Sequence, residues 1–471
     1  MTTDPSDLAA PWLNGDELKA LMAKNAKEDP VKIREIFAKA KEMKGLTLED
    51  VAALSAVEDK DLVEEMFAVA RHIKEEIYGR RVVFFAPLYV SNLCSNECAY
   101  CAFRKSNHQL VRQSLTQEQV AQQTEMILNQ GHKRGLIIAG EAYPGGLKYI
   151  LDCIETMYSV KTDKGELRRI NAELAPMTVD EFKSLKATNI GTYVCFQETY
   201  DRDVYKQVHL KGKKADFEWR ASTFDRAMLG GIDDVGLGVL FGLADWKYEV
   251  LGLMRHIQHL EERFGVGCHT ISFPRIEPAC GSEMSKNPPH AVSDLDFLKI
   301  IAIMRLAVPY TGMIMSTRET PEMRKKTLDL GISQISAGSR TDPGGYTEDD
   351  GKFEQDDAAQ FHLGDHRTLA QVIDSLVKDG MVPSFCTACY RLGRTGQDFM
   401  DLAKPGLIKQ NCAPNAISTF CEYLMDYASP ETIERGLAAI DKEIATLNPE
   451  GQKIAREVVK RVRAGERDVF C

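Results

Sequence analysis

Short apolar runs recur along most of the chain and alternate with longer segments of helical period. Runs rich in Val, Ile, Leu and Phe, bounded by polar or turn residues, are typical of strands buried on both faces. We expect eight such strands, at residues 82–90, 136–139, 169–174, 192–196, 234–240, 269–273, 312–316 and 333–337. Apolar positions at helical spacing predict helices between them at residues 117–130, 149–157, 217–229, 248–264, 295–306 and 321–330.

This alternation predicts an α/β fold. Eight strands that alternate with helices are typical of a parallel sheet closed into a TIM-type (β/α)8 barrel. Enzymes with that architecture carry their catalytic groups at the C-terminal ends of the strands. Reactive side chains directly after a predicted strand are therefore the first candidates for a functional site.

The same pattern divides the chain into three regions. Residues 1–80 are polar with helical spacing of their apolar positions, so we expect an N-terminal helical extension. Residues 81–340 hold the predicted barrel. Residues 341–471 begin with a stretch rich in Gly, Asp, Pro and His and continue with helical segments, which predicts a separate C-terminal domain.

Composition narrows the class of protein. The chain has 471 residues, of which 44% are hydrophobic and 27% charged, as in ordinary soluble globular proteins. A net charge of −10 argues against nucleic acid or an anionic membrane as partner, because both attract basic surfaces. The polar, acidic start of the chain is unlike a secretory signal. We expect a cytoplasmic protein whose 12 cysteines are reduced thiols and metal ligands.

Three cysteines follow the first predicted strand: Cys94, Cys98 and Cys101. Thiolates this close in sequence surround a single object, and a four-iron cluster takes one cysteine per iron. Such a cluster would keep one iron free for a ligand that is not protein. A zinc site is the alternative, but it needs a fourth ligand, for which His108 is the nearest candidate.

A second set of three cysteines lies in the C-terminal region, at Cys386, Cys389 and Cys412. By itself this spacing fits a second iron–sulfur cluster, a zinc ribbon that lacks one ligand, or a redox Cys-x-x-Cys pair with a separate thiol. We expect the other cysteines to be unligated. His256 and His259, three residues apart, are expected on a polar helical face.

The first set, with the aromatic Tyr100 before its last cysteine, resembles the signature of the radical S-adenosylmethionine (SAM) superfamily. In that superfamily the free iron binds SAM, and the reduced cluster cleaves SAM to a 5′-deoxyadenosyl radical. The resemblance implies that Glu141 contacts SAM, although Ala139 replaces the first glycine of the superfamily's motif there. Tyr100, Glu173 and Gly238 are further expected SAM contacts.

Stretches over nearly the whole chain resemble the tyrosine lyases that mature [FeFe]-hydrogenase. These stretches are residues 86–92, 196–200, 269–275, 316–319, 332–339 and 387–391. The resemblance implies two [4Fe–4S] clusters, the SAM cluster on the first cysteine set and an auxiliary cluster on the second. The free corner of the auxiliary cluster would link through a small amino-acid thiolate to an additional iron, with His269 as that iron's ligand.

The resemblance also implies a substrate site and a reaction. Arg318 follows the seventh strand and would clamp the carboxylate of tyrosine through two hydrogen bonds, with help from Ser316. Cleavage of the Cα–Cβ bond would give p-cresol and dehydroglycine. Dehydroglycine would become CO and cyanide on the additional iron, building the Fe(CO)(CN) precursor of the hydrogenase cluster. A low-potential electron donor and downstream hydrogenase maturation proteins are the implied partners.

Three alternatives stay open. A 2-iminoacetate (dehydroglycine) synthase of thiamine biosynthesis shares the first half of the reaction, but that family lacks the second cysteine set. A related lyase of another amino acid is the second alternative, because residues 140–146 and 171–173 look divergent. A non-catalytic iron–sulfur scaffold is the third, and a scaffold would need neither SAM nor a carboxylate clamp.

Overall fold

The computed structural model describes residues 10–346, 358–403 and 408–471. In this part of the chain, eight parallel strands close into a barrel, because β10 pairs with β1. In order around the barrel they are β1 (Arg81–Ser91), β2 (Arg134–Ala139), β5 (Arg169–Glu173), β6 (Tyr193–Glu198), β7 (Val235–Val239), β8 (Thr270–Ser272), β9 (Gly312–Met315) and β10 (Gln334–Ser336). Every predicted strand is present, so the predicted (β/α)8 barrel is confirmed.

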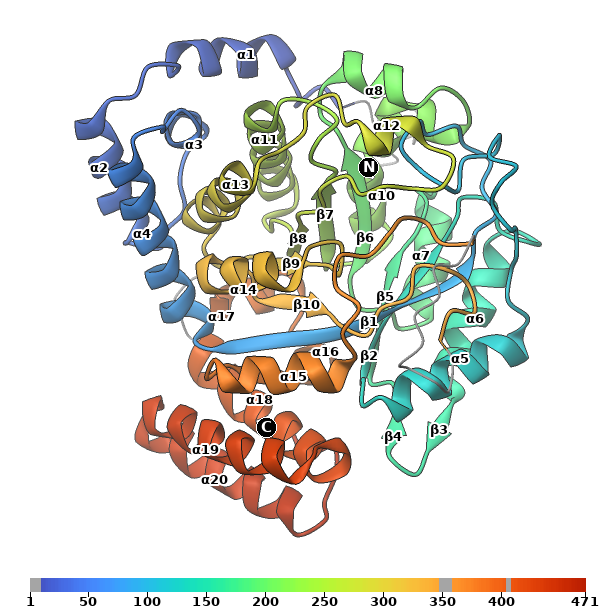
Figure 1. Ribbon diagram of the computed structural model, residues 1–471, viewed down its shortest axis with the longest axis vertical. Helices are drawn as coiled ribbons and strands as arrows, with labels where there is room; N and C mark the ends of the chain where they lie inside the picture. The colour runs from blue at the N-terminus through green and yellow to red at the C-terminus, as the bar shows by residue number, and fades with distance from the viewer. Residues whose placement is uncertain (1–9, 347–357, 404–407) are drawn as a thin grey trace.

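Helices connect successive strands and cover the outside of the barrel (Figure 1). Thr116 and Thr178 begin two of them with capping boxes, in which the threonine hydroxyl accepts a hydrogen bond from the backbone N–H three residues later. The connecting helices are α5 (Gln117–Asn129), α6 (Leu147–Ser159), α7 (Val179–Ala187), α8 (Arg202–Val208), α9 (Phe217–Ala221), α10 (Thr223–Leu229), α11 (Trp246–Phe264), α12 (Glu283–Lys286), α13 (Asp294–Ala307) and α14 (Pro321–Leu330).

The single helix predicted at residues 217–229 is wrong, because α9 ends at Ala221 and α10 begins at Thr223, with Ser222 between them. The Ser222 hydroxyl donates to the carbonyl of Glu218 and accepts from the Arg226 guanidinium. A serine that bonds locally to the backbone competes with continuation of the helix. A short hairpin, β3 (Lys161–Thr162) with β4 (Gly165–Glu166), also escaped prediction.

From residue 10 onward, four helices precede the barrel and pack against its outer helices α11 and α13. They are α1 (Gly15–Lys24), α2 (Pro30–Ala40), α3 (Leu48–Ser55) and α4 (Lys60–Tyr78). The expectation that His256 and His259 share a polar helical face is wrong for His256, which is fully buried. Its ring stacks on Trp12, and its Nδ1 hydrogen-bonds the Tyr200 hydroxyl, so it belongs to the packing between extension and barrel.

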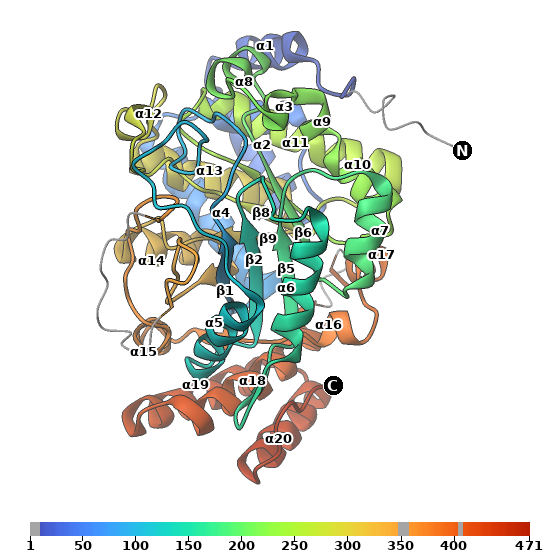
Figure 2. The same ribbon diagram turned by 90° about the vertical axis from the view of Figure 1, so that its right-hand side faces the viewer.

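The C-terminal region adds one strand and a group of helices. Strand β11 (Val382–Ser384) pairs in parallel with the first residues of β1, outside the closed barrel. Helices α18, α19 and α20 lie below the barrel in both views (Figures 1 and 2). The helices of this region are α15 (Leu369–Lys378), α16 (Ala388–Arg391), α17 (Gly396–Ala403), α18 (Ile408–Tyr427), α19 (Pro430–Thr446) and α20 (Pro449–Arg463). The domain boundary near residue 340 stays a prediction.

The register of β11 decides where the second cysteine set begins. Ser384 pairs with Val83 near the start of β1, so Cys386 emerges at the N-terminal ends of the barrel strands. Cys94 follows the opposite end of β1. None of the described helices is long and apolar enough to cross a membrane.

Candidate active site and second cysteine site

The first cysteine set lies at the C-terminal ends of the barrel strands. Cys94, Cys98 and Cys101 line one cavity, of about 570 Å³, together with the ends of β2, β5 and β6. We name this space the first cysteine cavity. The loop that carries it is anchored by a backbone hydrogen bond from the Ala99 N–H to the Val208 carbonyl. The three cysteines, which are close in sequence, therefore converge on one cavity.

Burial governs the chemistry of these thiols. It raises the pKa of Cys101 to about 11 and raises that of Cys98 further, with Lys214 opposing the shift at Cys98. A thiol binds iron as the thiolate, so a buried set of this kind favours a cationic metal group as its partner. In the described residues, no three His, Cys, Asp or Glu side chains are placed to hold a single metal ion.

Charged side chains complete the first cysteine cavity. Glu141 accepts hydrogen bonds from Arg220 at 2.9 Å and from Asn96 at 2.7 Å. Lys214 Nζ lies 2.6 Å from Glu198 Oε1. Burial alone would raise the pKa of Glu141, but Arg220 and Lys214 outweigh it and lower that pKa, so Glu141 is ionised. Buried carboxylates of this kind suit a ligand with ammonium and hydroxyl groups, as SAM has.

The other predicted SAM contacts lie in different positions around this cavity. Glu173 lines it directly. The Tyr100 hydroxyl instead hydrogen-bonds His209 Nε2 at 2.9 Å, and the Tyr100 ring packs beside Cys98. Gly238 leaves room on β7 for the Phe196 ring, which does line the cavity. Glu173 is therefore a candidate for direct contact with SAM, whereas Gly238 affects the cavity through the position of the Phe196 ring.

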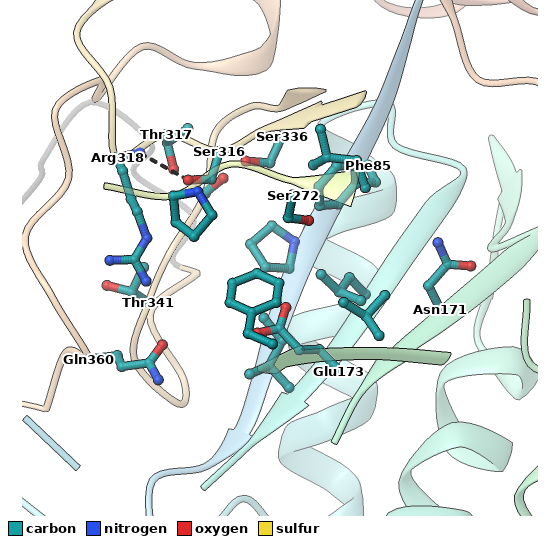
Figure 3. Close-up of a pocket in the computed structure, with 18 of the residues that line it drawn as sticks. Phe85, Asn171, Glu173, Ser272, Ser316, Thr317, Arg318, Ser336, Thr341 and Gln360 are labelled. Carbon is teal, nitrogen blue, oxygen red and sulfur yellow. Dashed lines mark hydrogen bonds between the residues drawn. The ribbon is translucent and has the colours of Figure 1, made fainter. Parts of the chain in front are cut away.

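A second cavity, of about 790 Å³, lies in the interior of the barrel and is lined by Arg318 and Ser316 among other residues. We call it the barrel cavity. In Figure 3, Arg318, Thr341 and Gln360 lie on one side of it, with Glu173 and Asn171 across from them.

Arg318 is held by packing rather than by an acidic partner. Its guanidinium stacks on Phe361, with 3.3 Å between the guanidinium carbon and the ring centre. The backbone N–H of Arg318 donates to the Ser316 hydroxyl, the dashed line in Figure 3. Among the described residues it forms no ion pair, and burial lowers its pKa despite the more distant Glu277 and Glu173. A partly buried guanidinium without a carboxylate partner is suited to receive one from a ligand.

The second cysteine set lines a third cavity, at the N-terminal ends of the strands. Cys386, Cys389 and Cys412 share this space of about 620 Å³ with His269. We name it the second cysteine cavity. Burial raises the pKa of Cys386, whereas a thiol hydrogen bond from Cys389 lowers that of Cys412 to about 6, with Arg81 adding to the effect. Arg81 is a cationic counterpart for thiolates in this cavity.

His269 directly precedes β8 and faces these cysteines. Its Nε2 lies 3.3 Å from the Tyr390 hydroxyl, and its Nδ1 lies 3.6 Å from Asp234 Oδ1. The Phe399 ring packs 4.5 Å away, centre to centre. Burial lowers the pKa of His269 despite Asp234, so the ring is neutral at pH 7. A neutral imidazole is a competent iron ligand.

Two glutamines link the three cavities. Gln334, at the start of β10, lines both the barrel cavity and the second cysteine cavity. Gln360 lines both the barrel cavity and the first cysteine cavity. The interior of the barrel therefore forms a series of spaces from one cysteine set to the other.

Sequence reasoning did not identify Lys214, Arg220 or Glu198, although all three line the first cysteine cavity. Glu198 carries a left-handed backbone with φ of 72° at the end of β6, which single-sequence patterns do not reveal. Arg220 lies in α9, a helix that the predicted segment 217–229 merged with α10. Glu198 could have been found from its place at a strand end.

Comparison with known proteins gives three results. The model of the Biotin and Thiamin Synthesis associated domain matches residues 272–382. The 2-iminoacetate synthases of Salmonella typhimurium and Escherichia coli are each 31% identical over 354 residues, which cover 75% of this chain and 90% of theirs. The 3-methylornithine synthase of Methanosarcina acetivorans is 25% identical over 267 residues, or 56% of this chain and 71% of that enzyme.

Two solved structures extend the similarity over almost the entire chain. A crystal structure of HydG, described as a maturase of the [FeFe]-hydrogenase, superposes with a TM-score of 0.94 at 47% identity, covering 98% of this chain and 100% of that one. HydG from Carboxydothermus hydrogenoformans, described as a FeFe-hydrogenase maturase, superposes with a TM-score of 0.84 at 36% identity and the same coverage.

Proposed function

From the premise that the chain belongs to the radical SAM enzyme family that includes HydG and 2-iminoacetate synthase, we propose that it is a tyrosine lyase of hydrogenase maturation. It cleaves the Cα–Cβ bond of tyrosine to p-cresol and dehydroglycine, and converts dehydroglycine to CO and cyanide. The observation that carries this proposal is the pair of cysteine-lined cavities at opposite ends of one barrel interior. A lyase that released dehydroglycine would need only the first of them.

The cysteines hold the cofactors in this proposal. Cys94, Cys98 and Cys101 bind the SAM cluster, and the second set, Cys386, Cys389 and Cys412, binds the auxiliary cluster. When bound, two [4Fe–4S] clusters and SAM supply the electron transfer and the radical chemistry. His269 and a small amino-acid thiolate hold the additional iron, which leaves the protein with its product. Glu141 and Glu173 line the space for SAM, and Tyr100 and Gly238 shape it through their neighbours Cys98 and Phe196.

Arg318 and Ser316 position tyrosine. The guanidinium of Arg318, already stacked on Phe361, donates two hydrogen bonds to the substrate carboxylate, and Ser316 adds a hydroxyl at the same edge. Fixing the carboxylate places the amino group toward the first cysteine cavity. Orientation of this kind determines which hydrogen is within reach of reaction, and it excludes water from the reacting atoms.

Gln334 lies on the route between the two halves of the reaction. It lines both cavities that the two-carbon fragment must visit. A Cβ placed on Gly312 would lie 2.6 Å from Gln334 Nε2. Glycine at this position therefore leaves room for the Gln334 side chain. Polar groups on this route suit a small charged fragment better than an apolar wall would.

Implied partners are a low-potential electron donor and downstream hydrogenase maturation proteins. One anaerobic assay tests the proposal: reconstituted protein with dithionite, SAM and tyrosine. We expect SAM cleavage, p-cresol, CO and cyanide. Absence of SAM cleavage in cluster-loaded protein would contradict the lyase assignment, and cleavage of SAM without p-cresol would contradict tyrosine as the substrate.

A second candidate function follows from the 31% identity to 2-iminoacetate synthases. In that case the chain would release dehydroglycine and would produce no CO. The second cysteine cavity, with His269 beside three cysteines, favours the maturase instead. The same assay distinguishes the two, because p-cresol with accumulated dehydroglycine and no CO would identify the synthase.

A further inference from the structure

Gln360 touches the walls of two cavities at once. Its side-chain oxygen accepts a hydrogen bond from the Tyr89 hydroxyl at 2.8 Å, and its Nε2 lies 3.9 Å from Cys101 Sγ. Figure 3 shows its amide at the edge of the barrel cavity, beneath Thr341 and Arg318. One side chain thus connects the substrate space with a thiol of the first cysteine set.

The backbone around Gln360 is tied to the same wall. The Gln360 N–H donates to the Thr341 carbonyl, and the Thr341 hydroxyl donates to the carbonyl of Phe361. Phe361 is the ring on which Arg318 stacks. A ligand that engages Arg318 therefore acts on a segment that also holds Gln360.

Tyr89 fixes the direction of the amide. The ring is 4% exposed, and burial raises the pKa of its hydroxyl, with Glu173 adding to the shift, so Tyr89 stays protonated and can donate. Because the amide oxygen accepts from Tyr89, the amide N–H₂ is directed to Cys101. A substrate group that takes the Tyr89 hydrogen bond for itself releases the amide from this orientation.

An N–H donor at a cluster sulfur changes the reduction potential of the cluster. Reduction adds negative charge to the irons and their thiolates, and a donor at sulfur stabilises that charge. Hydrogen bonds to the sulfurs are one of the features that determine the reduction potential of an iron–sulfur cluster.

We propose that Gln360 is a positioning residue that couples occupation of the barrel cavity to the reduction potential of the cluster on Cys94, Cys98 and Cys101. This inference rests on the proposed function for its substrate and cluster. An empty cavity leaves the Gln360 donor on Cys101, and bound tyrosine alters it through Tyr89 and Arg318. Because the donor stabilises the reduced cluster, its release by tyrosine lowers the midpoint potential, so electron entry depends on whether the barrel cavity is occupied.

The test is a reductive titration of the first cluster followed by its EPR signal, in cluster-loaded protein with S-adenosylhomocysteine in place of SAM to prevent turnover. Gln360→Glu keeps the acceptor for Tyr89, removes the donor to Cys101 and adds a negative charge. We expect its midpoint potential to fall, making reduction at least several-fold less favourable, where tenfold corresponds to about 59 mV for one electron. Gln360→Ala shifts in the same direction by less.

Tyrosine provides the second arm. We expect its addition to shift the midpoint of the wild type, and this shift to disappear in Gln360→Ala and in Tyr89→Phe. Gln109→Ala is the matched control, since Gln109 accepts from the thiol of Cys280 at 3.7 Å, outside both cysteine sets. Its midpoint and its response to tyrosine should equal those of the wild type.

Two results would overturn the inference. One is a wild-type midpoint in both Gln360 variants, and the other is a tyrosine-dependent shift that survives in Gln360→Ala. Iron content and the EPR signal of the second cluster show whether each variant is folded. Failure of the proposed function is a separate outcome. Even if the wild type makes no p-cresol, the midpoint potential of Gln360→Glu can still be compared with that of the wild type in the absence of tyrosine.

Discussion

Arg318 shows how a single side chain prepares a site before any ligand arrives. Its guanidinium is partly buried and stacked on Phe361, and no ion pair within the described residues satisfies it. Leaving a charge in this state costs free energy that a carboxylate ligand can recover. Much of the order that tyrosine binding requires is therefore already present in the folded chain.

Replacing Arg318 tests this role. A hydrogen bond between charged groups contributes about 2–3 kcal/mol, so Arg318→Ala should lower kcat/KM for tyrosine about 30- to 150-fold. Arg318→Lys keeps the charge but loses the bidentate geometry, and its loss should be smaller. The measurement is the initial rate of p-cresol formation at several tyrosine concentrations. An unchanged kcat/KM in both variants, with full iron content, would exclude the carboxylate clamp.

The contribution of Glu173 to the stability of the folded state depends on pH. Burial, and then the nearby Glu198, raises its pKa to about 7 from an ordinary value of 4.5. The folded state binds more protons than the unfolded state between these values, so the Glu173 contribution to stability falls as the pH rises through this range. Glu173→Gln removes this dependence.

We therefore expect Glu173→Gln to be more stable than the wild type above pH 7, by at most about 3 kcal/mol. The difference should shrink toward zero as the pH approaches 4.5. Chemical denaturation of both proteins at pH 5 and pH 8 measures it. A difference that is equal at the two pH values would mean that the pKa of Glu173 is not raised.

Sequence reasoning at this scale succeeded where spacing carries the information. The six cysteines of the two sets line two cavities, three in each, while their role as cluster ligands stays a prediction. It failed where partners are distant in sequence. Gln360 meets Tyr89 across 271 positions, and His256 is buried by Trp12 from the N-terminal extension. Neither glutamine nor histidine has a local pattern that marks such a contact.

Strand β11 is the element that connects the barrel to the second cysteine set. It is short, it contains Pro383, and it pairs with residues at the start of β1. The Val382 N–H donates to the carbonyl of Arg80 at 3.0 Å, and Arg80 in turn bonds the carbonyls of Asp379 and Gly380. This pairing fixes where Cys386 leaves the sheet.

Val382→Pro should disrupt the second cysteine site and leave the first intact. Proline has no N–H to donate to Arg80, and it restricts the preceding residue, so β11 would lose its pairing with β1. We expect loss of the second cluster, about half of the bound iron, with the EPR signal of the first cluster intact. Val382→Ile, which keeps the N–H, is the control. Full iron content in Val382→Pro would show that the pairing does not position Cys386.

Element prediction followed the strength of the periodic signal. The barrel strands are buried on both faces and read as continuous apolar runs, which is why all were predicted. β11 has only three residues, and the break between α9 and α10 depends on hydrogen bonds of Ser222 with Glu218 and Arg226. Tertiary contacts of this kind override local propensity.

The whole molecule places two chemistries at the two ends of one barrel. Its interior runs from the first cysteine cavity through the barrel cavity to the second, with Gln334 at the lower junction. A closed barrel keeps a reactive fragment away from water during this passage. The separation allows each half of the reaction to be disturbed alone.

Gly312→Ala tests the lower junction. The new Cβ would meet Gln334 Nε2 at 2.6 Å and force that side chain to move within the passage. We expect an unchanged rate of p-cresol formation, with CO and cyanide lowered several-fold and dehydroglycine released to solvent. Gly135→Ala is the control, because its Cβ would meet the flexible side chains of Met157 and Leu167 at 3.2–3.3 Å and Ile170 at 3.9 Å. Equal CO yields in the two variants would argue against this route.

The central claim is that one chain divides its reaction between two cysteine sites. The most direct measurement is the yield of p-cresol and of CO from Cys386→Ala/Cys389→Ala protein whose first cluster is intact by EPR. We predict p-cresol at close to the wild-type rate and no CO, cyanide or iron carbonyl product. Loss of p-cresol in this variant, or CO formed without the second cysteine set, would contradict the account.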